Sequence, residues 1–462
     1  MAHTANYNTN ESSTTDPSII EPSLLVEEET VRGYKPERYY PARIGEVFHD
    51  RYKIIGKLGY GSASTVWLCH DTSKECEYVA LKIYINSSKV HRELPIYNHI
   101  KGLQSQHGGL HHLRALLDSF EIHGPHGKHI CLVHEALGMN LDELRALVPD
   151  EMFEPDLVRH TLRDILRALH FLHVEAHIIH TDIQPRNILL GILDNTAFAR
   201  FQREELEHPI PRKELSDRVV YLSRPMSVTK GAPKLSDLSE ARFNSPQNVD
   251  LVMPDVYRAP EVVLGMPWSY SIDLWGFALT LWDVFEPKRL FRATGEDGRY
   301  SEEHHMAQMV AVMGPPPLEF LERSKRSHLF WDTEGNWKGT VPIPDISLET
   351  AEKRLQGDEK SLFLIFMRKT LQWRPEDRSD HTDVLMDEWL LADLIESGEV
   401  HGDKAQVLRV QGTKLHKSTK DPNEKRLVIT FSVETAGGTR LESNHACDDG
   451  TSTQKLTRAG GG

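Results

Sequence analysis

The decisive stretch of this chain is Ile179-His180-Thr181-Asp182-Ile183-Gln184-Pro185-Arg186-Asn187-Ile188-Leu189. It places a carboxylate and a carboxamide five residues apart, between two apolar runs. Asp182 can accept a proton from a hydroxyl group, and the side-chain oxygen of Asn187 can bind Mg²⁺. The alternative interpretation is structural, because Asp and Asn often cap turns. Motifs elsewhere in the chain decide between the two.

A glycine-containing turn lies upstream, in the run Gly59-Tyr60-Gly61-Ser62-Ala63-Ser64-Thr65-Val66. Glycines let the backbone turn tightly and bring N–H groups close to phosphates. Alone this signal is weak, because Gly-x-Gly is common in hairpins and Ser64 replaces the third glycine. Lys82 follows sixteen residues after Val66, inside the apolar run Val79-Ala80-Leu81-Lys82. An isolated Lys in a strand usually faces solvent, but Glu93 on the next helical stretch offers an ion-pair partner.

A second carboxylate ends the predicted strand Pro233-Lys234-Leu235-Ser236-Asp237. Asp237 can bind Mg²⁺ between two phosphates, and Ala259-Pro260-Glu261 closes the segment that follows. Each motif is modest alone, but their order and spacing make a joint coincidence very improbable.

Over roughly residues 50–392, these motifs resemble those of a eukaryotic protein kinase, and more closely those of the SR-protein kinase family. The closer resemblance is carried by six runs: Tyr40-Pro41-Ala42-Arg43-Ile44-Gly45-Glu46-Val47-Phe48, Lys57-Leu58-Gly59-Tyr60-Gly61, Ser64-Thr65-Val66-Trp67-Leu68, His129-Ile130-Cys131-Leu132-Val133-His134-Glu135, His180-Thr181-Asp182-Ile183, and Tyr257-Arg258-Ala259-Pro260-Glu261-Val262. The resemblance implies an α+β bilobal protein-kinase fold. It places a β-rich N-lobe at 51–136, a helical C-lobe at 137–392, and ATP between them. The implied activity is that of a serine/threonine kinase acting on Arg/Ser-rich proteins of the splicing-factor type.

The resemblance also assigns roles to single residues. Asp182 becomes the catalytic base, and Asn187 and Asp237 bind Mg²⁺. Lys82 binds ATP, with Glu93 as its partner. The expected nucleotide-binding residues are Leu58, Gly59, Tyr60, Gly61, Ser62, Ala63, Ser64, Thr65, Val66, Ala80, Lys82, Glu93, Glu135 and Leu137. His134 falls at the gatekeeper position, Asp273 is expected to brace the catalytic loop, and Arg378 is expected to hold Glu261 in a buried pair.

Three positions depart from the usual kinase pattern. Thr181 stands where most kinases have an Arg that grips an activation-loop phosphate, so we expect activity that is independent of loop phosphorylation, as in SR-protein kinases. Gln184 replaces a Lys that contacts the γ-phosphate, and Arg186 either supplies the missing cation or is a surface charge. Ser239 replaces a glycine after the metal-binding Asp237, which restricts the backbone there.

Composition limits the class of protein and its partners. The chain has 462 residues, a net charge of −14 and four cysteines without metal-site spacing. Such acidity argues against direct nucleic-acid binding and suits basic protein partners. Glu296, Asp297, Glu302 and Glu303 form an acidic cluster that either docks Arg-rich substrates or is a solvated loop. We expect a monomer of the cytoplasm and nucleus that does not bind membranes.

Outside these motifs, the composition predicts tails and a spacer. Residues 1–38 read as a flexible tail, 191–233 as a short spacer within the C-lobe, and 393–462 as a largely flexible tail. Within that last tail, 406–410 and 426–433 alternate like strands and are compatible with a hairpin. Two competing functions remain open at this point, a pseudokinase that acts as a scaffold and an active kinase with a different specificity.

Overall fold

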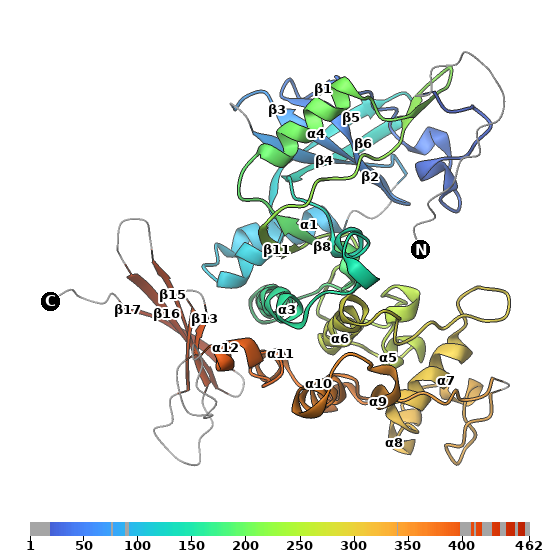
Figure 1. Ribbon diagram of the computed structural model, residues 1–462, viewed down its shortest axis with the longest axis vertical. Helices are drawn as coiled ribbons and strands as arrows, with labels where there is room; N and C mark the ends of the chain where they lie inside the picture. Colours follow the sequence, from blue (N-terminus) through green and yellow to red (C-terminus); the bar gives the residue numbers. More distant parts are fainter. Residues whose placement is uncertain are drawn as a thin grey trace. The chain divides into compact units, whose positions relative to one another are not determined.

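The computed structural model describes residues 19–74, 77–87, 92–339 and 341–397, together with the backbone of five strands between residues 408 and 457 (Figure 1). The chain divides into two compact units. The N-terminal unit comprises residues 1–90, 115–139 and 192–229, and the C-terminal unit comprises 91–114, 140–191 and 230–462. Within the described residues, no helix is both long enough and apolar enough to cross a membrane.

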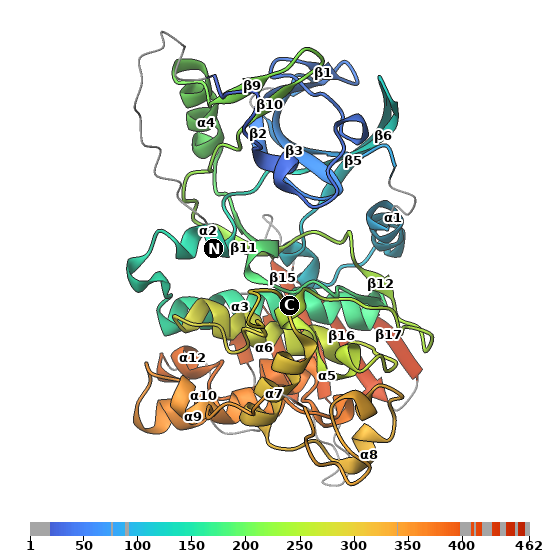
Figure 2. The same ribbon diagram turned by 90° about the vertical axis from the view of Figure 1, so that its right-hand side faces the viewer.

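A six-stranded antiparallel sheet forms the centre of the N-terminal unit, in the order β1-β2-β3-β4-β6-β5. Figure 2 shows this sheet as strongly curled, with β1, β2, β3, β5 and β6 labelled. Its strands are β1 (Val47–Phe48), β2 (Tyr52–Tyr60), β3 (Ser64–Asp71), β4 (Tyr78–Tyr84), β5 (Leu116–Gly124) and β6 (Gly127–Glu135). Alternate apolar side chains such as Tyr52, Ile54, Trp67 and Leu81 pack on one face as a buried core. The β-rich N-lobe expected from the sequence is confirmed.

The insertion between residue 191 and Asp237 also belongs largely to the N-terminal unit. Its residues 192–229 contain helix α4 (Thr196–Glu207) and the hairpin formed by β9 (Arg212–Glu214) and β10 (Val219–Tyr221). The prediction of a spacer within the C-lobe is therefore wrong in its placement. Charged and Pro-containing composition hid the three apolar anchors Phe198, Phe201 and Tyr221.

Close packing fixes α4 on the sheet. A Cβ added to Gly56 of β2 would lie 2.7 Å from the ring of Phe201, so the helix approaches the strand where a side chain is missing. On the same helix, Phe198 packs against the ring of Tyr78, and Gln202 accepts a hydrogen bond of 2.9 Å from the Tyr78 hydroxyl.

Residues 19–38 likewise have defined structure. They contain two short 3₁₀ helices, Glu27–Thr30 and Pro36–Arg38, and Ile19 pairs with Arg212 beside the hairpin of the insertion. The prediction of a flexible tail is wrong for residues 19–38, and residues 1–18 lie outside the described residues. Polar composition was a poor guide, because the contacts of this segment are largely ionic.

Helices dominate the C-terminal unit (Figure 1). They are α1 (Glu93–Leu103), α2 (Leu141–Arg145), α3 (Pro155–His170), α5 (Pro260–Val263), α6 (Ser271–Phe285), α7 (Glu302–Met313), α8 (Leu318–Leu321), α9 (Leu348–Ala351), α10 (Gly357–Thr370), α11 (His381–Leu385) and α12 (Ala392–Glu396). Every residue of α6 from Ile272 to Phe285 is buried, as its apolar sequence predicts. Helix α3 starts at Pro155 and buries an apolar stripe that includes Val158 and Leu162.

Two short strand pairs flank the loops that contain Asp182 and Asp237. β7 (Ile178–Ile179) pairs with β12 (Arg242–Phe243), and β8 (Ile188–Gly191) pairs with β11 (Gly231–Leu235). Further along the chain, β13 (Leu408–Val410), β14 (Thr413–Lys417), β15 (Leu427–Glu434), β16 (Arg440–Asp448) and β17 (Thr451–Thr457) form an antiparallel meander. Both tail segments predicted as strands are strands, but β14 lies between them, so they do not form a hairpin with each other.

Candidate active site

The loop that contains Asp182 is held by a carboxylate on the buried helix α6. Asp273 accepts hydrogen bonds from the backbone N–H of His180 at 2.7 Å and of Thr181 at 2.8 Å. His173 Nε2 lies 2.7 Å from the same carboxylate. Asp273 is fully buried, so these hydrogen bonds are shielded from water and fix the loop firmly. The brace expected from the sequence is present.

Strained backbone marks this region. Thr181 has φ +67° and Asp237 has φ +65°, in the left-handed region that few non-glycine residues adopt. Such conformations cost about 1–3 kcal/mol each and persist where surrounding contacts impose them. For Thr181 those contacts include Asp273 and a 2.7 Å hydrogen bond from its hydroxyl to the carbonyl of Glu240.

The carboxylate of Asp182 is oriented by two carboxamides. Asn187 Nδ2 donates to Asp182 Oδ2 at 2.6 Å and to the Asp182 carbonyl at 2.8 Å. Gln184 Nε2 donates to Asp182 Oδ1 at 2.5 Å. Burial, together with the nearby negative charge of Asp237, raises the pKa of Asp182 to about 7, although both amides and Arg186 oppose this rise. A carboxylate in this position is poised to accept a proton near neutral pH.

Asn187 and Asp237 are placed at the ends of the paired strands β8 and β11. Ile188 is paired with Leu235, and Ser236 N donates to the carbonyl of Asn187 at 2.8 Å. Asn187 binds Asp182 through its side-chain nitrogen, so the contact with Asp182 does not use its side-chain oxygen. Asp237 contributes carboxylate oxygens. Oxygen atoms of this kind fit Mg²⁺, which prefers carboxylate and carbonyl ligands.

Most of the expected nucleotide-binding residues lie in the N-terminal unit. The glycine-rich loop joins β2 to β3, and Lys82 lies in the middle of β4, paired with Val66 on one side and Leu132 on the other. Ala80, two residues before Lys82 on β4, pairs with His134 of β6. Glu135 ends β6 and accepts a 2.7 Å hydrogen bond from Ala115 N.

Glu93 belongs to the C-terminal unit. It is the first residue of α1 and is buried.

Two of the unusual residues have their own contacts. Arg186 is exposed, and its Nε lies 4.0 Å from Asp142 Oδ2. Ser239 donates its backbone N–H to Asp237 Oδ1 at 3.2 Å, and its φ is not positive, so a glycine is not required there.

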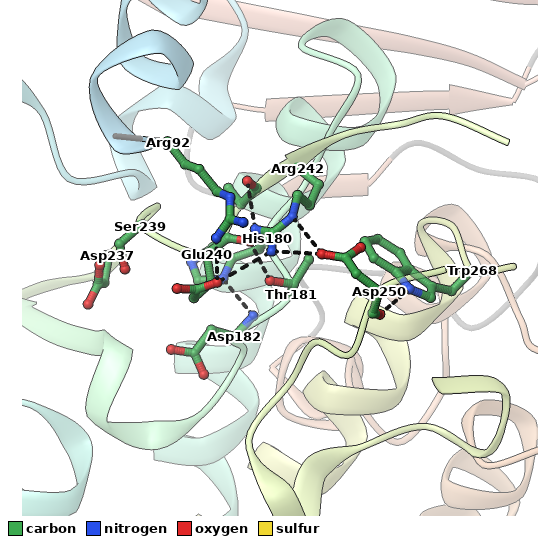
Figure 3. Close-up of polar contacts among 11 residues, drawn as sticks. Arg92, His180, Thr181, Asp182, Asp237, Ser239, Glu240, Arg242, Asp250 and Trp268 are labelled. Carbon is green, nitrogen blue, oxygen red and sulfur yellow. Dashed lines mark hydrogen bonds and ion pairs between the residues drawn. The ribbon is translucent and has the colours of Figure 1, made fainter. Parts of the chain in front are cut away.

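An ion-pair network surrounds the backbone next to Thr181, and sequence analysis missed it (Figure 3). Arg242 lies 3.0 Å from Asp250 Oδ2 and 3.5 Å from Glu240 Oε2, and it also donates to the carbonyl of Glu240. Arg92 lies 3.2 Å from the same Glu240 carboxylate. No signal in a single sequence reveals this network, because its members are spread over three segments.

The family model of the protein kinase domain matches residues 52–390. The chain is a member of the protein kinase family. A serine/threonine protein kinase of Aspergillus fumigatus is 39% identical over 379 residues, which cover 81% of this kinase and 93% of that protein. The serine/threonine-protein kinase SRPK of Physarum polycephalum is 32% identical, covering 78% and 90% of the two chains. A crystal structure of a kinase domain aligns with a TM-score of 0.60 at 22% identity, covering 76% of this kinase and 99% of that chain, and it supports the fold alone.

This kinase is therefore an ATP-dependent protein serine/threonine kinase with the α+β kinase fold. One further structural expectation is confirmed. Arg378 Nη1 and Nη2 bind the two carboxylate oxygens of Glu261 at 2.7 and 2.6 Å in a fully buried pair. The contact between Gln184 and the proposed base was missed, since a motif gives a residue's position but not the group it binds.

Proposed function

We propose that this kinase transfers the γ-phosphate of ATP to serine residues in Arg/Ser-rich proteins. The observation that carries the chemical part is the Asp182 carboxylate, which two amides orient inside a loop braced by Asp273. Lys82, Asn187 and Asp237 complete the group of residues that phosphoryl transfer requires.

In the proposed mechanism, Asp182 accepts the proton of the substrate serine hydroxyl while that oxygen attacks the γ-phosphorus of ATP. The bond from this phosphorus to the β–γ bridging oxygen breaks, and ADP leaves. Gln184 and Asn187 keep both carboxylate oxygens in fixed directions, so the base needs little reorganisation when the serine arrives. The raised pKa of Asp182, caused first by burial, makes the carboxylate a stronger base than an exposed one.

The remaining assigned residues would hold the nucleotide and its metal. Lys82 would bind the α- and β-phosphates with Glu93 as its partner, and Asn187 and Asp237 would hold Mg²⁺ through oxygen atoms. Bound Mg²⁺ would neutralise charge on the transferred phosphoryl group. Arg186 would supply the cation that Gln184 lacks, and its charge already lowers the pKa of Asp182.

Two observations support basic substrates. The net charge of −14 favours the approach of Arg-rich segments, and the Physarum relative is named SRPK. The resemblance to SR-protein kinases extends this to Arg/Ser-rich splicing factors.

The acidic cluster supports docking only in part. Glu302 is paired with Arg326 at 2.6 Å, and Asp297 accepts the backbone N–H of Arg299 at 2.9 Å. Glu302 and Glu303 also lie in the first turn of α7, where acidic residues stabilise a helix without any ligand. Charge steering by the whole surface is therefore the better-supported part of the proposal.

We also propose that activity is independent of loop phosphorylation. The Thr181 hydroxyl donates a hydrogen bond to the Glu240 carbonyl, and Arg242 forms ion pairs with the carboxylates of Glu240 and Asp250. The two carboxylates neutralise the Arg242 guanidinium, which is the part that a phosphate on the loop would otherwise play.

The test compares four peptides of equal length, in which serines alternate with Arg, Lys, Glu or Ala. Purified kinase is treated with phosphatase, freed of the phosphatase and given Mg²⁺ and labelled ATP. The proposal predicts the highest kcat/KM on the Arg-Ser peptide and no labelling by Asp182→Ala. Preference for the Glu-Ser or Ala-Ser peptide would retain the kinase and reject the basic specificity. Nucleotide binding without transfer to any peptide would favour a pseudokinase.

A further inference from the structure

The glycine-rich loop is contacted by a residue from outside the matched kinase domain. Tyr39, in the segment that precedes β1, places its hydroxyl 2.9 Å from the Gly61 carbonyl and 3.1 Å from the Ser62 carbonyl. The tyrosine is 5% exposed, so its position is fixed by packing and the proton is shielded from competing water. Its single O–H proton is shared between the two carbonyls.

Fixing these carbonyls also fixes two N–H groups. In a trans peptide the C=O of one residue and the N–H of the next point in opposite directions. Because the Gly61 and Ser62 carbonyls are turned toward Tyr39, the N–H groups of Ser62 and Ala63 are turned away from it. Backbone N–H groups at the tip of such a loop are the ones that receive phosphate oxygens.

The backbone next to Tyr39 is itself anchored. Asn86, just after β4, donates its backbone N–H to the Arg38 carbonyl at 2.9 Å and its side-chain amide to the Glu37 carbonyl at 2.9 Å. From the insertion, the buried guanidinium of Arg218 donates to the Pro36 carbonyl.

Three consecutive glutamates lock the start of this segment to the sheet and the insertion. Glu28 pairs with Lys57 of β2, which is 1% exposed and also donates to the Tyr221 carbonyl at 3.0 Å. Glu29 pairs with Lys213 of β9 at 2.7 Å. Glu27 accepts hydrogen bonds from the backbone and hydroxyl of Ser223, in the insertion. Removing one partner of a buried pair leaves an uncompensated buried charge, so these pairs specify which segments meet at this junction.

We propose that residues 19–39 and the insertion 192–229 form a bracket that presets the glycine-rich loop for ATP, with Tyr39 as the positioning residue. This inference depends on the ATP use of the kinase family and not on the proposed Arg/Ser specificity. It gives the insertion a role in nucleotide binding, because Arg218 holds the segment that carries Tyr39.

The test is Tyr39→Phe, which keeps the buried ring and removes only the hydroxyl. Loss of one hydrogen bond predicts a KM for ATP about three- to tenfold higher, with kcat and the KM for the peptide little changed. Tyr40→Phe is the matched control, because the neighbouring hydroxyl donates to Glu46 at 2.7 Å instead of to the loop. An unchanged KM for ATP in Tyr39→Phe, or an equal rise in Tyr40→Phe, would overturn the proposal.

A second measurement does not depend on turnover. Hydrogen–deuterium exchange without nucleotide should be faster in a peptide covering residues 60–64 for Tyr39→Phe than for wild type or Tyr40→Phe. Arg218→Met should give a smaller change of the same sign, since it loosens the bracket one contact further away. Exchange at residues 60–64 that is the same in all variants would contradict the bracket, even if the kinase is inactive on every peptide tested.

Discussion

The proposed catalytic loop (residues 180–187) and the glycine-rich loop (residues 59–66) are held in different ways. Asp273, from a fully buried helix of the kinase domain, accepts the N–H groups of His180 and Thr181. In the glycine-rich loop the Gly61 and Ser62 carbonyls receive a hydroxyl from Tyr39, which lies before the matched residues 52–390. The first loop is fixed by the core of the kinase domain. The second also depends on the segment before β1 that carries Tyr39 and on the insertion 192–229.

This difference suggests where variation is tolerated. Changes in the braced catalytic loop should affect turnover, because the groups there are proposed to contact the reacting atoms or to hold those that do. Changes in the bracket should affect nucleotide affinity, because they alter how far the loop must be ordered when ATP binds.

The largest effect is expected for Asp182→Asn. This substitution keeps the shape of the side chain but removes the proton acceptor, so kcat should fall about 10²- to 10⁴-fold. Nucleotide affinity, measured by titration with a fluorescent ATP analogue, should change little. A variant that retains more than a tenth of wild-type kcat would show that Asp182 is not the base.

Asp273→Asn should weaken the brace without removing the buried group. Hydrogen bonds to a charged acceptor contribute about 1.5–3 kcal/mol, so kcat should fall about 10- to 100-fold while the KM for ATP is retained. Asp283→Asn is the matched control, because Asp283 is buried on the same helix but binds the Tyr257 hydroxyl at 2.5 Å. An equal loss of kcat in both variants would indicate general destabilisation of α6.

Arg186→Ala should lower kcat about tenfold, because it removes the only cation proposed to compensate for Gln184. The double variant Gln184→Lys/Arg186→Ala should recover most of that loss, since lysine restores a charge beside Asp182. Steady-state kinetics on the Arg-Ser peptide provide the measurement. If Arg186→Ala has wild-type kcat, Arg186 is a surface charge and Gln184 is simply tolerated.

The smallest effect is expected for Arg242→Met. The partners Glu240 and Asp250 are exposed, and pairs of this kind contribute about 1 kcal/mol or less, so kcat should fall no more than about fivefold. Phosphatase treatment should change neither the wild type nor the variant. A large loss of wild-type activity after that treatment would show that the kinase needs a phosphate after all.

Sequence reasoning was most successful where function requires particular residue types at short spacing. Asp182, Asn187 and Asp237 could be proposed as base and metal ligands because these roles need oxygen-bearing side chains, and the roles stay predictions. The burial of helix α6 follows from its apolar composition. Contacts between distant segments could not be predicted. Tyr39 lies 22 residues from Gly61 and Arg218 lies 182 residues from Pro36, and no period or motif links them.

The same limit explains the two errors of organisation. Residues 19–38 and the insertion are polar and charged, a composition that usually indicates mobile chain. Their charges are instead satisfied mutually, by pairs such as Lys57 with Glu28 and Lys213 with Glu29. Composition records how many charges a segment has, but not whether each has a partner.

The most direct test of this account is nucleotide affinity measured beside turnover for wild type, Asp182→Asn, Tyr39→Phe and Tyr40→Phe. The account predicts that Asp182→Asn and Tyr39→Phe each lower one of the two quantities, turnover or affinity, and leave the other unchanged. Asp182→Asn should lose turnover and keep affinity, whereas Tyr39→Phe should lose affinity about three- to tenfold and keep turnover, with Tyr40→Phe like wild type. If Tyr39→Phe lowers turnover at saturating ATP and leaves affinity unchanged, the two loops are not separately controlled and the account is contradicted.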